Sequence, residues 1–197
     1  MPLLDPTRST LLLIDLQGKL VHQVHRSPLV LEAAHRLMRF AELFTVPVLL
    51  TEQYPKGLGP TEPGLRARFD ALTTPAFLLE KSAFSCCGDP GFQDLLLAAR
   101  PGLAMHQRQI VVGGIEAHVC VVQTVLGLLE AGCEVHLCWD AVSGRGEEYR
   151  KHAIERMAAA GATLTNHESV AFEWARTKDH ASFKAISALF KEGQPQG

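Results

Sequence analysis

Six short apolar runs recur along the chain, and a segment with helical spacing or helix-capping residues separates each run from the next. A continuous apolar run of this length is typical of a β-strand that is buried on both faces. Strands that alternate with helices are joined by right-handed crossovers and lie parallel in one sheet. The sequence therefore predicts an α/β fold, a three-layer αβα sandwich with a six-stranded parallel sheet of the Rossmann-like kind. The expected strands span residues 10–14, 48–51, 76–79, 109–112, 134–138 and 162–165.

The bounds of the expected helices come from capping residues and from apolar spacing. Ser27 and Pro28 are typical of a helix start, as are Asp89 and Pro90. Gly161 is a typical residue just after a helix end. The expected helices span residues 27–44, 65–72, 89–99, about 120–131, 147–160 and 182–190. Residues 52–64 are dense in Gly and Pro, so we expect a long irregular loop there.

The chain has 197 residues, which suits a single domain over residues 1–197. Nineteen basic and 21 acidic residues leave it almost neutral, without the basic surface that nucleic acid or lipid would require. Five cysteines at irregular spacings fit neither a disulfide framework nor a zinc site. The opening MPLLDPTRST has no secretory signal pattern, and no apolar stretch is long enough for a bilayer. We expect a cytoplasmic protein.

The stretch VVGGIEAHVCVVQT, residues 111–124, predicts a buried strand, a sharp bend and a helix. It places Cys120 in or just before the first helical turn. Unpaired N–H groups and the helix dipole there favour a thiolate, so we expect a lowered pKa for this thiol. The same N–H groups can hold an oxyanion. Cys120 is thus a candidate nucleophile, although most free cysteines are small buried hydrophobes.

Two further chemical groups are predicted at the same edge of the sheet. Asp15 follows the first strand and Lys81 follows the third, as Cys120 follows the fourth. Ligands of such sheets bind outside the carboxyl ends of the strands. A carboxylate, an ammonium and a thiol are therefore expected to meet there. The alternatives are that Asp15 only binds loop amides and that Lys81 is a solvated charge paired with Glu80.

Four ordered motifs resemble the isochorismatase-like cysteine hydrolase superfamily: LLLIDLQ, EKSAFS, GGIEAHVCVVQT and DAVSGR. TEQYPKGLGPT together with GIEAHVC is most similar to the isochorismatase domain-containing protein subgroup. The resemblance covers nearly the whole chain. It implies the isochorismatase-like hydrolase fold and a homo-oligomer.

The resemblance also implies roles for particular residues. The catalytic triad would be Asp15, Lys81 and Cys120. The bond between Ile115 and Glu116 would be a cis peptide, and the N–H groups of Glu116 and Cys120 would form the oxyanion hole. The implied reaction is hydrolysis of a small amide or related acyl substrate, with a C–N bond broken through a thioester on cysteine.

Two departures from the superfamily narrow this reading. Nicotinamidases carry an Asp-x-His metal motif after the second strand, whereas this chain has Thr51-Glu52-Gln53, so we expect no metal. Isochorismatases proper typically lack the cysteine, and its presence here favours carbonyl chemistry. His22 and His25 have no third ligand nearby, and residues 144–146 are too short for a nucleotide loop. We expect no cofactor.

The substrate-binding residues are predicted only from their nearness in sequence to the triad or to the sheet edge. A catalytically retired binding or scaffold protein remains an alternative, and so does a thiol-redox protein in which Cys86 or Cys87 resolves an oxidised Cys120. The sequence does not decide whether either cysteine lies near the site. The predicted walls of the substrate pocket are Gln17, Leu20, Tyr54, Phe84, His118 and Trp139.

Overall fold

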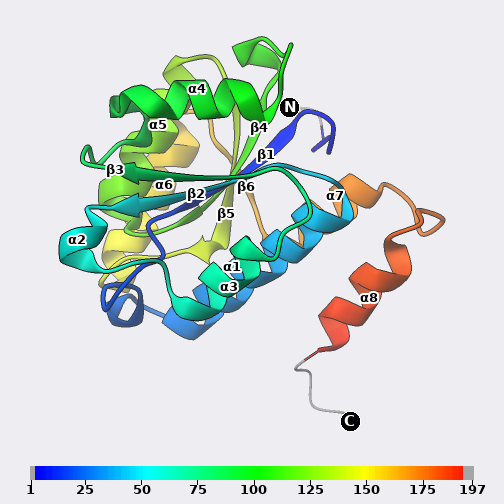
Figure 1. Cartoon of the computed structure of the whole chain (residues 1–197), viewed down its shortest axis with the longest axis horizontal. Helices are drawn as coiled ribbons and strands as arrows, with labels where there is room; N and C mark the ends of the chain where they lie inside the picture. Colours follow the sequence, from blue (N-terminus) through cyan, green and yellow to red (C-terminus); the bar gives the residue numbers. More distant parts are fainter. Residues whose placement is uncertain (1–2, 193–197) are drawn as a thin grey trace.

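A six-stranded parallel sheet forms the centre of the molecule (Figure 1). The computed structural model describes residues 3–192, and the strands follow the order β3-β2-β1-β4-β5-β6. This topology confirms the predicted α/β fold class. The predicted single domain over 1–197 includes residues 1–2 and 193–197, which lie outside the described part. The strands are β1 (Ser9–Ile14), β2 (Val48–Gln53), β3 (Ala76–Lys81), β4 (Gln109–Gly114), β5 (Glu134–Val142) and β6 (Thr163–Thr165).

Helices cover both faces of the sheet (Figure 1). The core on one side of the sheet contains residues of α1 (Ser27–Leu43), α3 (Pro63–Asp70), α7 (His167–Ala175) and α8 (Phe183–Lys191). The core on the other side contains residues of α4 (Pro90–Ala99), α5 (Val122–Glu130) and α6 (Glu147–Ala159). None of the described helices is long and apolar enough to cross a membrane. The shorter segments are α2 (Pro55–Leu58), the 3₁₀ turns η1 (Val21–Gln23), η2 (Cys86–Gly88) and η3 (Met105–Gln107), and the π-helical turn η4 (Ala117–Val121).

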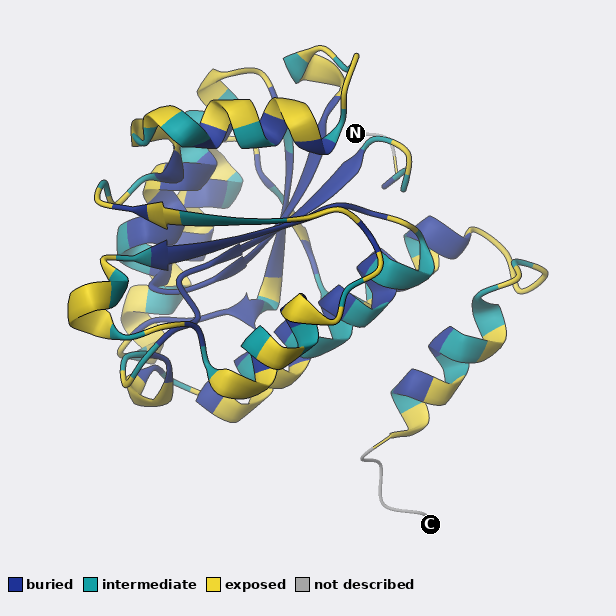
Figure 2. Cartoon of the chain, viewed as in Figure 1, coloured by how far each residue is buried: buried dark blue, intermediate teal, exposed yellow. Residues whose placement is uncertain are grey.

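The strands supply alternate side chains to two separate cores. Leu11 and Leu13 of β1 lie in the core with α1, whereas Leu12 and Ile14 lie in the core with α5. All four are buried, because side chains of a strand point alternately to the two faces and both faces are covered. Figure 2 shows the central strands buried between helices whose outer faces are exposed, while β3 at one edge of the sheet is partly exposed. This burial explains why the strands appear in the sequence as continuous apolar runs.

Sequence reasoning missed two helices and shortened several strands. It omitted α7 (His167–Ala175), although Asn166 caps this helix by accepting a hydrogen bond from the N–H of Ser169. The predicted loop 52–64 contains α2 (Pro55–Leu58), which begins at a proline suited to the first helical turn. β5 continues to Val142, past residues 139–141, which were expected to follow the strand.

The strand order reverses between β1 and β4, since β2 and β3 lie on one side of this pair and β5 and β6 on the other. In open parallel sheets, a crevice forms at the carboxyl ends of the two strands where the order reverses. The residues that follow β1 and β4 therefore occupy the position in this fold that is best suited to a ligand.

We predict that Gly114→Ala destabilises the protein by at least about 3 kcal/mol, the sum of left-handed backbone strain and steric overlap. Gly114 has φ +130°, and a Cβ there would lie 2.2 Å from the carbonyl oxygen of Ile14. Gly161→Ala is the matched control, because Gly161 has φ +113° and a Cβ there meets nothing within 4 Å. Urea unfolding of both variants would measure the difference. Equal losses of stability would contradict the prediction.

Candidate active site

Asp15 and Lys81 form a buried ion pair at the carboxyl edge of the sheet. Asp15 follows β1 directly and has φ 53°, a left-handed conformation, while Lys81 is the last residue of β3. The Nζ atom of Lys81 lies 2.7 Å from Oδ2 of Asp15, and each residue is 2% exposed. Two groups that are 66 positions apart in sequence therefore meet in the interior.

Residues of β2, the strand between β1 and β3, complete the hydrogen bonding of this pair. The hydroxyl of Thr51 donates to Oδ1 of Asp15 at 2.7 Å, and Oε1 of Gln53 accepts from Lys81 Nζ at 2.7 Å. The carbonyl oxygens of Phe84 and Ala83 lie 3.1 and 3.3 Å from the same nitrogen. Both charges are thereby satisfied, which a buried ion pair requires. Sequence reasoning missed the contribution of Thr51 and Gln53.

Cys120 lies in η4 (Ala117–Val121), the π-helical turn between β4 and α5. Its side chain is in the core between the sheet and α5, and the residue is 7% exposed. The carbonyl of Cys120 accepts a hydrogen bond of 2.8 Å from the hydroxyl of Thr124. The bond between Ile115 and Glu116, just before the turn, is a cis peptide.

The pKa of the Cys120 thiol is raised to about 12, mainly because burial disfavours the charged form. The carboxylate of Asp15 raises this pKa further by opposing a second negative charge nearby, whereas Lys81 lowers it. The lowered pKa expected from the sequence is therefore wrong. The three side chains do come together, but the cysteine rests as a thiol beside a carboxylate.

The turn of residues 114–121 is named the nucleophile turn after the candidate nucleophile Cys120, and several of its N–H groups donate to carbonyl oxygens within the fold. Ala117 N–H donates to the carbonyl of Ser143 at 2.7 Å, and those of Val119 and Val121 donate to the carbonyl of Glu116. In the described part of the chain, the N–H of Glu116 donates to no backbone carbonyl oxygen. A backbone donor of this kind is suited to stabilise the oxyanion of a tetrahedral intermediate.

Three of the predicted substrate-binding residues lie in or beside the loops after β1, β2 and β3. The amide of Gln17 is engaged with the backbone of Gln53 and Gly59. Tyr54 is 60% exposed, and Phe84 is 57% exposed. The role of these three residues in substrate binding stays a prediction.

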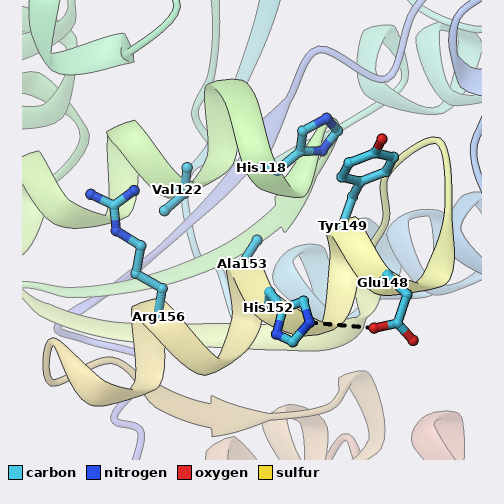
Figure 3. A pocket seen from close by; sticks show the side chains of 7 residues that line it. All are labelled: His118, Val122, Glu148, Tyr149, His152, Ala153 and Arg156. Carbon is cyan, nitrogen blue, oxygen red and sulfur yellow. Dashed lines mark ion pairs between the residues drawn. The ribbon is translucent and has the colours of Figure 1, made fainter.

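The other three predicted substrate-binding residues are Leu20, His118 and Trp139. Leu20 borders a groove formed with η1 and α2, and Trp139 is 43% exposed on β5. His118 stacks on Tyr149 with ring centroids 4.8 Å apart. It lines a groove of about 320 Å³ between η4 and α6 whose lining residues include no member of the triad (Figure 3).

The structure also places the two adjacent cysteines, which the sequence left open. Cys86 is fully buried, and its N–H donates to the hydroxyl of Thr124 at 2.9 Å. Because that hydroxyl donates to the carbonyl of Cys120, one threonine connects the two cysteine backbones. Cys87 is exposed. Within residues 3–192, no group of three or more His, Cys, Asp or Glu side chains is arranged to hold a metal ion.

Comparison with known proteins decides the family. The family model "Isochorismatase domain" matches residues 9–169 of the chain. The chain belongs to this family. "Isochorismatase domain-containing protein 2" of Macaca fascicularis is 40% identical over 190 residues, 96% of this chain and 86% of that protein.

Solved structures of similar proteins share the fold. A protein described as MAR1 ribonuclease from Caenorhabditis elegans has a TM-score of 0.85 and 36% identity, covering 98% of this chain and 95% of that one. The YcaC gene product of Escherichia coli, described as an octameric hydrolase of unknown specificity, has a TM-score of 0.84 and 26% identity. That match covers 96% of this chain and 90% of the other. The fold is therefore that of the isochorismatase-like hydrolases.

The raised pKa of Cys120 predicts how its reactivity depends on pH. Below the pKa, the thiolate fraction grows about tenfold per pH unit. The rate of alkylation by iodoacetamide, followed at the Cys120 peptide by mass spectrometry, should therefore keep rising from about pH 7 to about pH 10. A plateau below about pH 8 would contradict the prediction, because it would mean a thiolate at neutral pH.

Proposed function

We propose that this isochorismatase family member is a metal-independent cysteine hydrolase acting on a small amide or related acyl compound. The observation that carries the proposal is the buried Asp15–Lys81 pair, which sets a carboxylate beside the thiol of Cys120. The N–H group of Glu116, which has no backbone acceptor in the described part of the chain, would hold the carbonyl oxygen together with the N–H of Cys120. A base, a nucleophile and an oxyanion site are the parts that acyl transfer to cysteine requires.

In the first half of the reaction, the sulfur of Cys120 attacks the carbonyl carbon while Asp15 takes the thiol proton. The high pKa of the resting thiol makes this proton transfer necessary. Negative charge moves to the carbonyl oxygen, where the two N–H groups stabilise it. When the C–N bond breaks, Asp15 returns the proton to the leaving nitrogen, and an acyl thioester remains on Cys120.

In the second half, Asp15 removes a proton from water as the water oxygen attacks the thioester. The C–S bond breaks, the acid product leaves, and the proton returns to the sulfur of Cys120. Lys81 does not exchange protons in this scheme. Its ammonium group is held by Asp15, Gln53 and the carbonyls of Ala83 and Phe84, so it keeps Asp15 oriented and compensates its charge.

We further propose that the protein assembles into a homo-oligomer. Support comes from YcaC, which is described as octameric and which matches 96% of this chain. Light scattering of the purified protein would show the state directly, and a monomer at micromolar concentration would overturn the proposal.

We predict that Cys120→Ala abolishes acylation of the protein by 4-nitrophenyl acetate, an activated ester that thiols attack. The wild type should release a burst of 4-nitrophenolate and carry an acetyl group on Cys120, because the thioester is the first product. Asp15→Asn should slow the burst by about a hundredfold through loss of the general base. Stopped-flow absorbance and intact-protein mass spectrometry measure both effects. An undiminished burst from folded Cys120→Ala would contradict the proposed function.

The name of the Caenorhabditis elegans neighbour suggests a separate test against RNA. Cleavage of RNA needs no thioester, so a contaminating or unrelated ribonuclease activity should be unchanged in Cys120→Ala. The wild type should instead release ammonia from some member of a panel of small amides. The Cys120→Ala variant should release none. RNA cleavage that depends on Cys120 and Asp15, with no amide turnover, would overturn the acyl assignment.

A further inference from the structure

The side chain of Glu116 is buried at the base of the nucleophile turn, and its partner lies outside. Glu116 is 5% exposed, whereas the side chain of Arg145 is 67% exposed. The Nε and Nη2 atoms of Arg145 donate to the two carboxylate oxygens at 2.8 and 3.2 Å. Within residues 3–192, Glu116 forms no second ion pair. A buried carboxylate in the turn is thus balanced by one surface guanidinium.

The loop that carries Arg145 forms hydrogen bonds to two other segments, the nucleophile turn and the loop after η1. The carbonyl of Ser143 accepts from the N–H of Ala117 at 2.7 Å. The N–H of His25, in the loop after η1, donates to the carbonyl of Gly144 at 2.8 Å, and Ser143 Oγ donates to the carbonyl of His25 at 2.5 Å. Residues 143–145 therefore connect the nucleophile turn to the loop after η1.

We propose that Arg145 is a positioning residue for acyl transfer: its two-point hold on Glu116 keeps the backbone N–H of Glu116 aimed at the developing oxyanion. This inference rests on the proposed function, because it assigns a role in the same reaction. Glu116 supplies both the carboxylate that Arg145 holds and the N–H that the oxyanion needs. Fixing the side chain at two oxygens limits rotation of the backbone to which it is attached.

The charge of the pair supports the same role. Without Arg145, an unpaired buried carboxylate would lie on the residue that supplies one of the oxyanion donors and would oppose negative charge on the carbonyl oxygen. The chain would relieve this by turning the carboxylate toward water, and the N–H of Glu116 would move with it. Lysine cannot replace arginine fully, because an ammonium group is a point charge and not a planar fork.

The test compares two reactions of the same sulfur. Acylation by 4-nitrophenyl acetate passes through an oxyanion, whereas alkylation by iodoacetamide displaces iodide at a saturated carbon and needs no oxyanion hole. In Arg145→Met, the acylation rate should fall by about tenfold or more, while the alkylation rate of Cys120 at pH 9 stays within about twofold. Arg145→Lys should restore part of the acylation rate.

The matched control is Arg39→Met, which removes another arginine that holds a carboxylate, Glu192, at two oxygens. Its acylation rate should equal that of the wild type. Unchanged acylation in Arg145→Met would overturn the inference, and so would an equal fall of acylation and alkylation, since that would show general damage to the turn. If Arg145→Met does not fold, the acylation and alkylation rates of Arg145→Lys are compared with those of the wild type instead. A fall in acylation alone would support the inference. A burst that persists in Cys120→Ala would instead refute the proposed function and leave the role of Arg145 without a reaction.

Discussion

The contact between Asp15 and Lys81 is the constraint on which the site depends. Both side chains are buried, and a buried ion pair costs nearly as much in desolvation as it returns in attraction. Such a pair is maintained only where hydrogen bonds satisfy every charge. Thr51 and Gln53 supply those bonds from β2, and two carbonyls after β3 complete them. Three adjacent strands must therefore end in one register for the pair to exist.

Burial is the main reason why the pKa of the Cys120 thiol is raised. The carboxylate of Asp15 acts in the same direction by opposing a second anion at the sulfur, and Lys81 partly offsets this effect. At neutral pH the sulfur is therefore mainly a thiol, which is a weaker nucleophile than a thiolate. In the proposed mechanism, a bound carbonyl supplies the missing acceptor of charge, because the negative charge passes to an oxygen that backbone N–H groups can hold. Reactivity would then arise with the substrate in place and not before.

Much of this arrangement follows from local sequence. Apolar runs predicted the strands, and the polar residues after them predicted an edge at which Asp15, Lys81 and Cys120 collect. The position of the nucleophile was accessible because a strand, a glycine pair and a helix have a recognisable order. The helix α7 (His167–Ala175) was missed because its nine residues span too few turns for the apolar spacing to repeat clearly. Its Trp174 is nevertheless buried in the core with α1.

The sequence by itself determined the order of the elements and the chemical groups at their ends, since both depend on neighbouring residues. Tertiary structure decided which groups touch. Gln53 pairs with Lys81 across β2 and β3, and Ile14 pairs with Thr51 across β1 and β2, so strand register places both polar side chains against the ion pair. It also decided the pKa of Cys120 and the pairing of Glu116 with Arg145. Burial and the approach of charges from distant segments control both, and no local pattern carries that information.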